Sequence, residues 1–130
     1  MSESTTPTYR PGACNIGTRQ RRQRYRLAGG ALLAGVVYVA VVALSSVPAA
    51  LALGAFVPFS LGVEWYLQGR RSFCAALGFA GRYEFEDDAG EVADTDARTT
   101  DRRYAFRLTV LGLFGGGGLS LVAYAVTVLV

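Results

Sequence analysis

Three side chains in this sequence are candidates for chemistry: the thiols of Cys14 and Cys74 and the carboxylate of Glu64. The chain has no histidine and two cysteines in all. This excludes histidine-ligated zinc or haem, Ser-His-Asp and Cys-His catalysis, and a four-cysteine zinc or iron–sulfur site within one chain. Two thiols without histidine suit a reversible disulfide or a soft metal ion such as Cu(I). Because no CxxC motif joins them, the alternative is that Cys74 is a small buried apolar side chain beside Phe73 and that Cys14 has no role.

Arginines near both cysteines bear on thiol reactivity. Arg19 follows Cys14, and Arg70 and Arg71 precede Cys74. If these groups are close in space, the positive charge favours the thiolate and lowers the pKa of both thiols.

The composition indicates a membrane protein. A chain of 130 residues has room for one domain, and 52% hydrophobic against 18% charged residues is too apolar for an ordinary soluble domain of this size. All 13 basic residues are arginine, although lysine serves equally well as a solvated charge. Together with the Asp-rich segment, this preference indicates a lineage bias, such as that of a salt-adapted, haloarchaeal microbe.

Long uncharged runs predict three transmembrane helices. No formal charge occurs over residues 27–63, whereas one helix needs about 20 residues to cross the bilayer. The turn-forming sequence at 45–48 divides this run, because paired serines and Pro48 interrupt a helix. The predicted spans are therefore 27–44, 49–68 and 108–130, the first two forming an antiparallel hairpin.

Small residues on the predicted spans suggest close helix packing. A run of glycines from Gly115 to Gly118 is tolerated in a helix within lipid, where leaving the helix costs more than keeping it. Pro58 lies in the middle of the second span and should kink it. We interpret the residues spaced at multiples of four as helix-packing positions rather than pore positions; these are Gly112, Gly116 and Ser120 on the third span and Gly54 and Gly62 on the second.

The distribution of arginine predicts the orientation. Every arginine precedes the first span or lies between the second and the third, and basic residues near span ends are retained in the cytoplasm. The fold class is thus an all-α, multi-pass protein of the cytoplasmic membrane, with the N-terminus in, the C-terminus out and a charged cytoplasmic loop. A cleaved signal peptide is disfavoured because a second span follows at once. Both cysteines then face the cytoplasm, where a permanent disulfide is disfavoured.

The predicted organisation has four parts: a disordered, basic tail at 1–18, a juxtamembrane segment and hairpin at 19–68, an interfacial segment and acidic loop at 69–107, and the third span at 108–130. The first helix should extend back to Arg19, with Asn15 or Thr18 as its N-cap. The short apolar segment 72–81 should lie at the interface, with Phe73, Leu77 and Phe79 buried.

Charges outside the spans are segregated. Residues 1–26 are basic and residues 83–101 are acidic. We expect the acidic stretch to be a solvated loop; the alternative is that it docks on the basic segment. Asp94 and Arg98 have the spacing of a helical ion pair, so a helix over residues 91–107 that leads into the third span is a further alternative for this segment. The basic segment is expected to hold anionic lipid headgroups, through Arg19, Arg21, Arg22, Arg24 and Arg26.

Glu64 is the one acidic residue at membrane depth. An intramembrane carboxylate is a candidate for proton relay or ion coordination. Its position near the end of the second span favours instead an ion pair, with Arg26, Arg70 or Arg107 as the candidate partners.

Three stretches carry a resemblance to other sequences: "ACNIG" before the first span, "LQGRRSFCAALGFAG" ending the second, and "DRRYAFRL" opening the third. With these, the chain resembles small prokaryotic three-span membrane proteins that have Cys-Asn-Ile-Gly before the first span and Phe-Cys after the second. The resemblance covers residues 13–107 in pieces and implies no activity.

The sequence thus predicts a structural or accessory membrane component rather than an enzyme, with no cofactor apart from the soft-metal alternative. Expected partners are a bilayer with anionic headgroups and a second copy or a larger membrane complex, and no nucleic acid. One alternative is a dithiol redox or soft-metal protein that uses Cys14 and Cys74. Another is an oligomeric channel or transporter that uses Glu64.

Overall fold

The computed structural model describes residues 9–85 and 88–130. The chain is mostly helical, with one small sheet. Its elements, in order, are α1 (Thr18–Leu44), the 3-10 helix η1 (Ala49–Ala55), α2 (Phe56–Arg71), α3 (Ala75–Ala80), β1 (Arg82–Phe85), β2 (Asp88–Glu91) and α4 (Thr95–Leu129).

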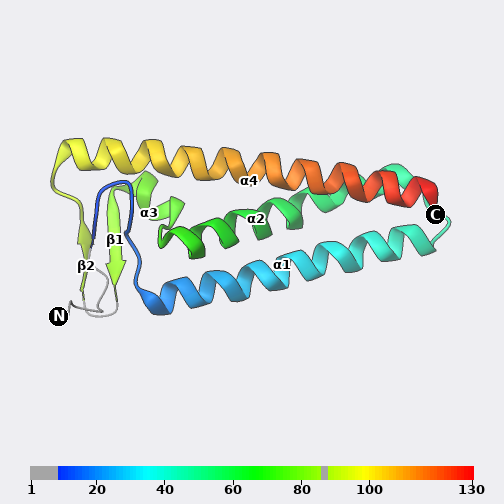
Figure 1. The fold of residues 1–130 in the computed structure, drawn as a ribbon, viewed down its shortest axis with the longest axis horizontal. Coiled ribbons are helices and arrows are strands. Elements are labelled where there is room, and N and C mark those ends of the chain that lie inside the picture. The colour runs from blue at the N-terminus through cyan, green and yellow to red at the C-terminus, as the bar shows by residue number, and fades with distance from the viewer. Residues whose placement is uncertain (1–8, 86–87) are drawn as a thin grey trace.

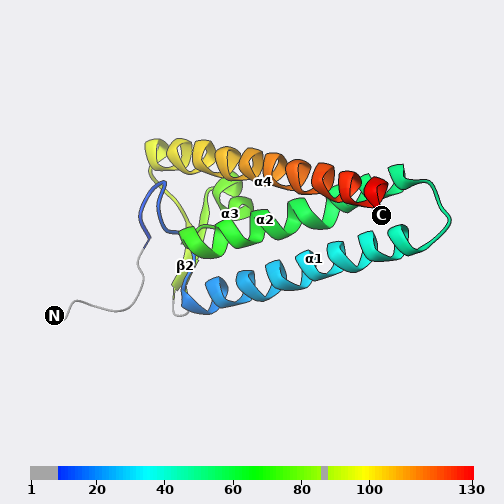
Figure 2. The ribbon, with the colours of Figure 1, turned by 45° about the vertical axis from the view of Figure 1, so that its right-hand side comes forward.

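Three long segments run side by side in an elongated bundle (Figure 1). Helix α2 lies between α1 and α4 and packs on both, whereas α1 and α4 contact each other little (Figure 2). The segments Thr18–Leu44, Ala49–Arg71 and Thr95–Leu129 are each long and apolar enough to cross a membrane. The prediction of three membrane-spanning helices is confirmed to that extent.

The second span differs from the prediction of a single α-helix kinked in its middle. It starts with 3-10 turns at Ala49 and becomes α-helical only at Phe56, so that Pro58 lies in the first turn of α2. A proline ring clashes with the carbonyl four residues earlier in an α-helix but is accepted in a first turn. Pro58 therefore sets where the α-helix begins.

Helix α4 extends well before the predicted third span. It begins after Asp94, whose carboxylate accepts a hydrogen bond from the Ala97 amide at 3.2 Å. The predicted Asp94–Arg98 ion pair is wrong, because Asp94 acts as the N-cap. Arg98 instead pairs with Glu91 at 3.3 Å and donates to the Val92 carbonyl.

One end of the bundle carries an ordered cap, which we define as residues 9–17, α3 and the β1–β2 hairpin with the residues that join it to α4. The two strands are antiparallel, with Arg82 opposite Glu91, and Ile16 forms a parallel bridge with Glu84. The sheet corrects the all-α expectation. The expected acidic loop is in part a hairpin, since residues 82–85 and 88–91 pair with each other and β1 pairs with the N-terminal segment. Its acidic side chains at Glu84, Asp88 and Glu91 are exposed, as expected; Glu86 and Asp87 lie outside the described residues.

The N-terminal segment is anchored on α4 through a buried carboxylate. Asp101 is 0% exposed and accepts hydrogen bonds from the Tyr9 hydroxyl at 2.6 Å and the Gly12 amide at 2.7 Å. The positive φ of Gly12, +65°, and the proximity of Thr100 leave no room for a side chain there. The predicted disordered tail is therefore wrong for residues 9–17, while residues 1–8 lie outside the described part of the chain.

Packing in the bundle depends on small residues on α4. Gly112, Gly116 and Ser120 are buried in the bundle. A Cβ added at Gly112 would lie 2.9 Å from the Cβ of Glu64, and one at Gly116 would lie 2.5 Å from the Ser60 Cα. The close approach of α2 and α4 thus requires glycine at both positions.

The two glycines expected to pack from the second span lie against α1. Gly54 contacts the Tyr38 ring, whose hydroxyl donates to the Leu51 carbonyl at 2.6 Å. Gly62 contacts the Leu32 side chain. The small residues of the second span and of α4 thus pack against other helices of the same chain.

Candidate functional site at the junction of cap and bundle

Asn15 fixes the cap to the end of α2. Its side chain is 0% exposed and makes two hydrogen bonds to one residue: Oδ1 accepts from the Cys74 amide at 2.7 Å, and Nδ2 donates to the Cys74 carbonyl at 3.2 Å. Its main chain bonds the Ser72 carbonyl at 3.0 Å and the Glu84 amide at 2.9 Å. Only a carboxamide offers a donor and an acceptor side by side in this way.

Asn15 is therefore not the N-cap of α1. The cap residue is Gly17, without a side-chain hydrogen bond, and Thr18 is the first helical residue. The reason is tertiary: satisfying two main-chain groups of buried Cys74 is worth more than satisfying one exposed helix end.

A chain of hydrogen bonds leads from Cys74 toward the interior of the bundle. Arg24 on α1 donates from Nη2 to the Cys74 sulfur at 3.1 Å and from Nε to Gln68 Oε1 at 3.0 Å. Gln68 in turn donates to Glu64 Oε2 at 3.3 Å, and the Glu64 carboxyl also has a side-chain hydrogen bond with Thr109 on α4. We call these five residues the Cys74–Thr109 chain.

The expected ion pair of Glu64 is wrong. Among the described residues the ion pairs are Arg82–Glu91 and Arg98–Glu91, and Glu64 bonds neutral partners instead. Arg24 on α1 is linked to Glu64 through Gln68, and Glu64 itself lies against Gly112 of α4.

The Cys14 thiol is held apart from this chain. It is 5% exposed and its sulfur lies 3.7 Å from the Ile16 carbonyl, to which it donates. Burial raises the pKa of Cys14, and the charges of Arg10 and Arg21 offset this only in part. The predicted lowering of the Cys14 pKa is wrong, because removal from water outweighs the arginines.

The fold nonetheless links the backbones of the two cysteines through Asn15. Asn15, the neighbour of Cys14, holds both main-chain groups of Cys74. Both thiols are buried and free rather than joined in a disulfide. Within residues 9–85 and 88–130 no three cysteine or acidic side chains group as metal ligands; a two-thiol Cu(I) site stays a prediction.

The five arginines proposed for lipid binding divide into two sets. Arg21 donates to the Gly69 carbonyl at 2.9 Å, where a cation satisfies the C-terminal end of α2, and Arg24 belongs to the Cys74–Thr109 chain. The other three are exposed on α1; they are Arg19, Arg22 and Arg26.

Sequence reasoning missed Tyr9, Asp101 and the role of Gln68. Burial and the Asp101 carboxylate raise the pKa of Tyr9 above its ordinary value, so the hydroxyl stays protonated and donates. A usable signal was present only for Gln68, an uncharged polar residue four positions after Glu64 and hence on the same helix face.

Three long apolar helices closed at one end by a small polar cap define a multi-pass membrane protein. No protein-family model, no curated protein and no solved structure matches the chain. Its function is therefore inferred from its own residues.

Proposed function

We propose that this protein is a small structural or accessory component of the cytoplasmic membrane, with the N-terminus and the cap in the cytoplasm and the C-terminus outside. The observation that supports this is the closed interior of the bundle. Gly116 leaves space only for the Ser60 main chain, and Gly62 only for Leu32. A monomer packed in this way has no route for a solute, so its role lies in what its outer surface and cap bind.

The outer surface of the bundle suits contact with lipid or with other membrane helices. Large apolar side chains on α1 and α4 are strongly exposed, among them Leu33 at 64%, Phe114 at 76% and Leu121 at 62%. An accessory component would place some of these faces against a partner helix and the rest against acyl chains.

The proposed orientation has a direct test. Single cysteines are introduced at Ser46, in the turn between the first two spans, and at Arg22, in a background where Cys14 and Cys74 are replaced by serine. A membrane-impermeant maleimide should label the Ser46→Cys variant on intact cells and the Arg22→Cys variant only after permeabilisation. The reverse pattern would overturn the orientation.

The accessory role is tested in membranes of the source cell. Patches of membrane extracted into native nanodiscs, without detergent, should contain this chain in an assembly of fixed stoichiometry. The purified chain, reconstituted alone at a high ratio of lipid to protein, is the control and gives the mass of a single chain for comparison. If the native nanodiscs contained the protein only as a single chain with no other protein, both an accessory role in a complex and a homo-oligomer would be ruled out.

A second candidate function is thiol redox chemistry, favoured by the Asn15 bridge between Cys14 and the Cys74 main chain. In exchange with a partner disulfide, a bond forms between the two sulfurs, the partner's S–S bond breaks, and the two electrons and two thiol protons pass to the partner, which becomes a dithiol. Alkylation with mass tags should then show Cys14 and Cys74 changing state together, and Cys14→Ser should abolish the change at Cys74. Independent labelling would eliminate this candidate.

A third candidate uses Glu64 in an oligomeric channel or transporter. It is favoured by the neutral hydrogen-bond partners of this carboxyl, which leave no guanidinium paired with it. Ion or proton flux in liposomes should be lost in Glu64→Gln. No flux with the wild-type protein, or equal flux with the variant, would eliminate it.

A further inference from the structure

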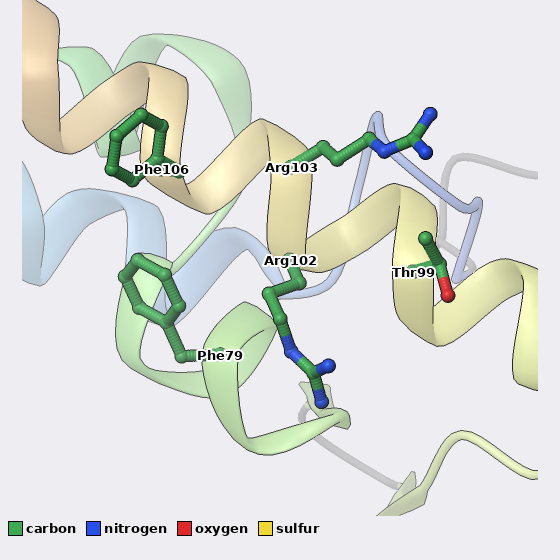
Figure 3. A pocket seen from close by; sticks show the side chains of 5 residues that line it. All are labelled: Phe79, Thr99, Arg102, Arg103 and Phe106. Carbon is green, nitrogen blue, oxygen red and sulfur yellow. The ribbon is translucent and has the colours of Figure 1, made fainter.

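An open cavity of about 470 Å³ lies between α3 and the first third of α4. Four of its lining residues are spaced on α4 as one helix face, at positions i, i+3, i+4 and i+7, and Phe79 of α3 forms the opposite wall (Figure 3). The four residues on α4 are Thr99, Arg102, Arg103 and Phe106.

The cavity has an apolar part and a cationic part. Figure 3 shows the rings of Phe79 and Phe106 facing each other at one end of it; the side chain of Arg102 extends beside α3, and that of Arg103 extends away from α3. The aromatic residues are 42% and 63% exposed, although Phe79 was predicted to be buried. Two exposed aromatic rings beside two guanidinium groups match a ligand with an acidic head and an apolar tail.

Unlike Arg82 and Arg98, which pair with Glu91, Arg102 and Arg103 have no counter-ion within the described residues. Both are exposed, and neither forms a hydrogen bond or ion pair with the described part of the chain. The nearest acidic residue in the sequence, Asp101, is turned inward to Tyr9 and Gly12. Their charge is therefore available to an external anion.

The position of the cavity relative to the bilayer indicates which kind of anion it binds. The uncharged run of α4 begins at Leu108, two residues after Phe106 and directly after Arg107, and aromatic residues concentrate at the boundary between acyl chains and headgroups. On the proposed orientation, residues 99–106 of α4 thus lie at the headgroups of the inner leaflet, whose surface is anionic.

We propose that this cavity binds one anionic phospholipid of the surrounding bilayer. The phosphate accepts hydrogen bonds from Arg102, with Arg103 supplying the second positive charge. The first segment of an acyl chain lies against Phe106 and Phe79. This site differs in place from the predicted one on the arginine-rich start of α1, where Arg22 and Arg26 are exposed.

The test is native mass spectrometry of the full chain released from nanodiscs that contain equal amounts of phosphatidylglycerol and phosphatidylcholine with the same acyl chains. The wild-type protein should retain one phosphatidylglycerol in preference to phosphatidylcholine. The double variant Arg102→Gln/Arg103→Gln should lose this preference by about tenfold, because both positive charges that face the anionic headgroup are removed. Phe106→Ala should weaken retention without any change of charge.

The matched control is Arg70→Gln/Arg71→Gln, which removes the same charge from exposed positions at the end of α2 and should retain the lipid as the wild type does. An equal loss of the preference for phosphatidylglycerol in the two double variants would mean that the lipid is retained by general surface charge, and this would overturn the proposal. Displacement of the lipid by millimolar inorganic phosphate would also overturn it, since the site would then bind phosphate and not a lipid. Unchanged retention in both Phe106→Ala and Arg102→Gln/Arg103→Gln would exclude this cavity.

Discussion

Helix α2 presents different chemistry to its two neighbours. Toward α1 the contacts of the segment 59–62 are apolar: the Phe59 ring fills the space at Gly35, and Leu32 fills the space at Gly62. Such contacts tolerate small adjustments, because a side chain can shift or change rotamer. Within the described part of the chain, hydrogen bonds to α1 occur at the end of α2, where Gln68 and Gly69 accept from Arg24 and Arg21.

Toward α4 the same helix presents a polar row. Ser60, Glu64 and Gln68 recur every four residues, and the facing positions Gly116 and Gly112 let the two backbones come close enough to shield them. Here a substitution meets main chain rather than the end of a side chain. We infer that the α2–α4 interface fixes the geometry of the bundle, while the α1–α2 interface fills volume.

The largest expected effect is therefore at Gly116. In Gly116→Val, the added Cβ would lie 2.0 Å from Ser60 Oγ and 2.5 Å from the Ser60 main-chain nitrogen. We expect a loss of about 3 kcal/mol in the free energy of unfolding, measured in mixed micelles. Gly118→Val is the control, because nothing lies within 4 Å of a Cβ there; equal losses would contradict the assignment of the close contact to Gly116.

A smaller loss is expected on the α1 side. In Gly35→Val the added Cβ meets only the edge of the Phe59 ring, at 2.5 Å, and the ring can move. We expect a loss of about 1–2 kcal/mol, measured in the same assay. A loss as large as that of Gly116→Val would remove the distinction between the two interfaces.

Gln68→Leu tests whether the polar row is connected to the cap. The change removes the acceptor of the Arg24 Nε–H and the donor to Glu64, for an expected cost of about 1–2 kcal/mol. Alkylation of Cys74 should also become faster, because Arg24 loses one of its two anchors. Gln23→Leu, at an exposed position on α1, is the control. An unchanged rate of Cys74 alkylation in Gln68→Leu would contradict a connection between Cys74 and the polar row.

The smallest effect is expected at Ser60, with the opposite sign. Its hydroxyl is buried and has no hydrogen-bond partner among the described residues, so Ser60→Ala should stabilise the protein by about 0.5–1 kcal/mol. The matched change Ser120→Ala removes a hydroxyl that donates to the Gly117 carbonyl at 2.9 Å and should not stabilise it. A destabilised Ser60→Ala variant would mean that this hydroxyl has a partner in the membrane.

The spans were predictable because their signal is local: an uncharged run of sufficient length crosses a bilayer almost regardless of context. The start of α2 at Phe56 was not predictable from the sequence. Pro58 acts on a carbonyl one turn earlier, and its effect is a change from 3-10 to α-helix rather than a break in the uncharged run. The cap was hidden for a different reason. Asn15 and Asp101 act through main-chain groups 59 and 89 residues away, and no spacing in the sequence marks such pairs.

The anchoring of Tyr9 and Gly12 on Asp101 also constrains biogenesis. A nascent chain emerges from its N-terminus, so residues 9–12 leave the ribosome long before the segment that will hold them. The first two spans can enter the translocon while this segment is still without its partner, and the N-terminal end settles only after the beginning of the last helix has been made. A stop codon anywhere upstream of position 101 would therefore leave the earliest residues of the protein without their final place.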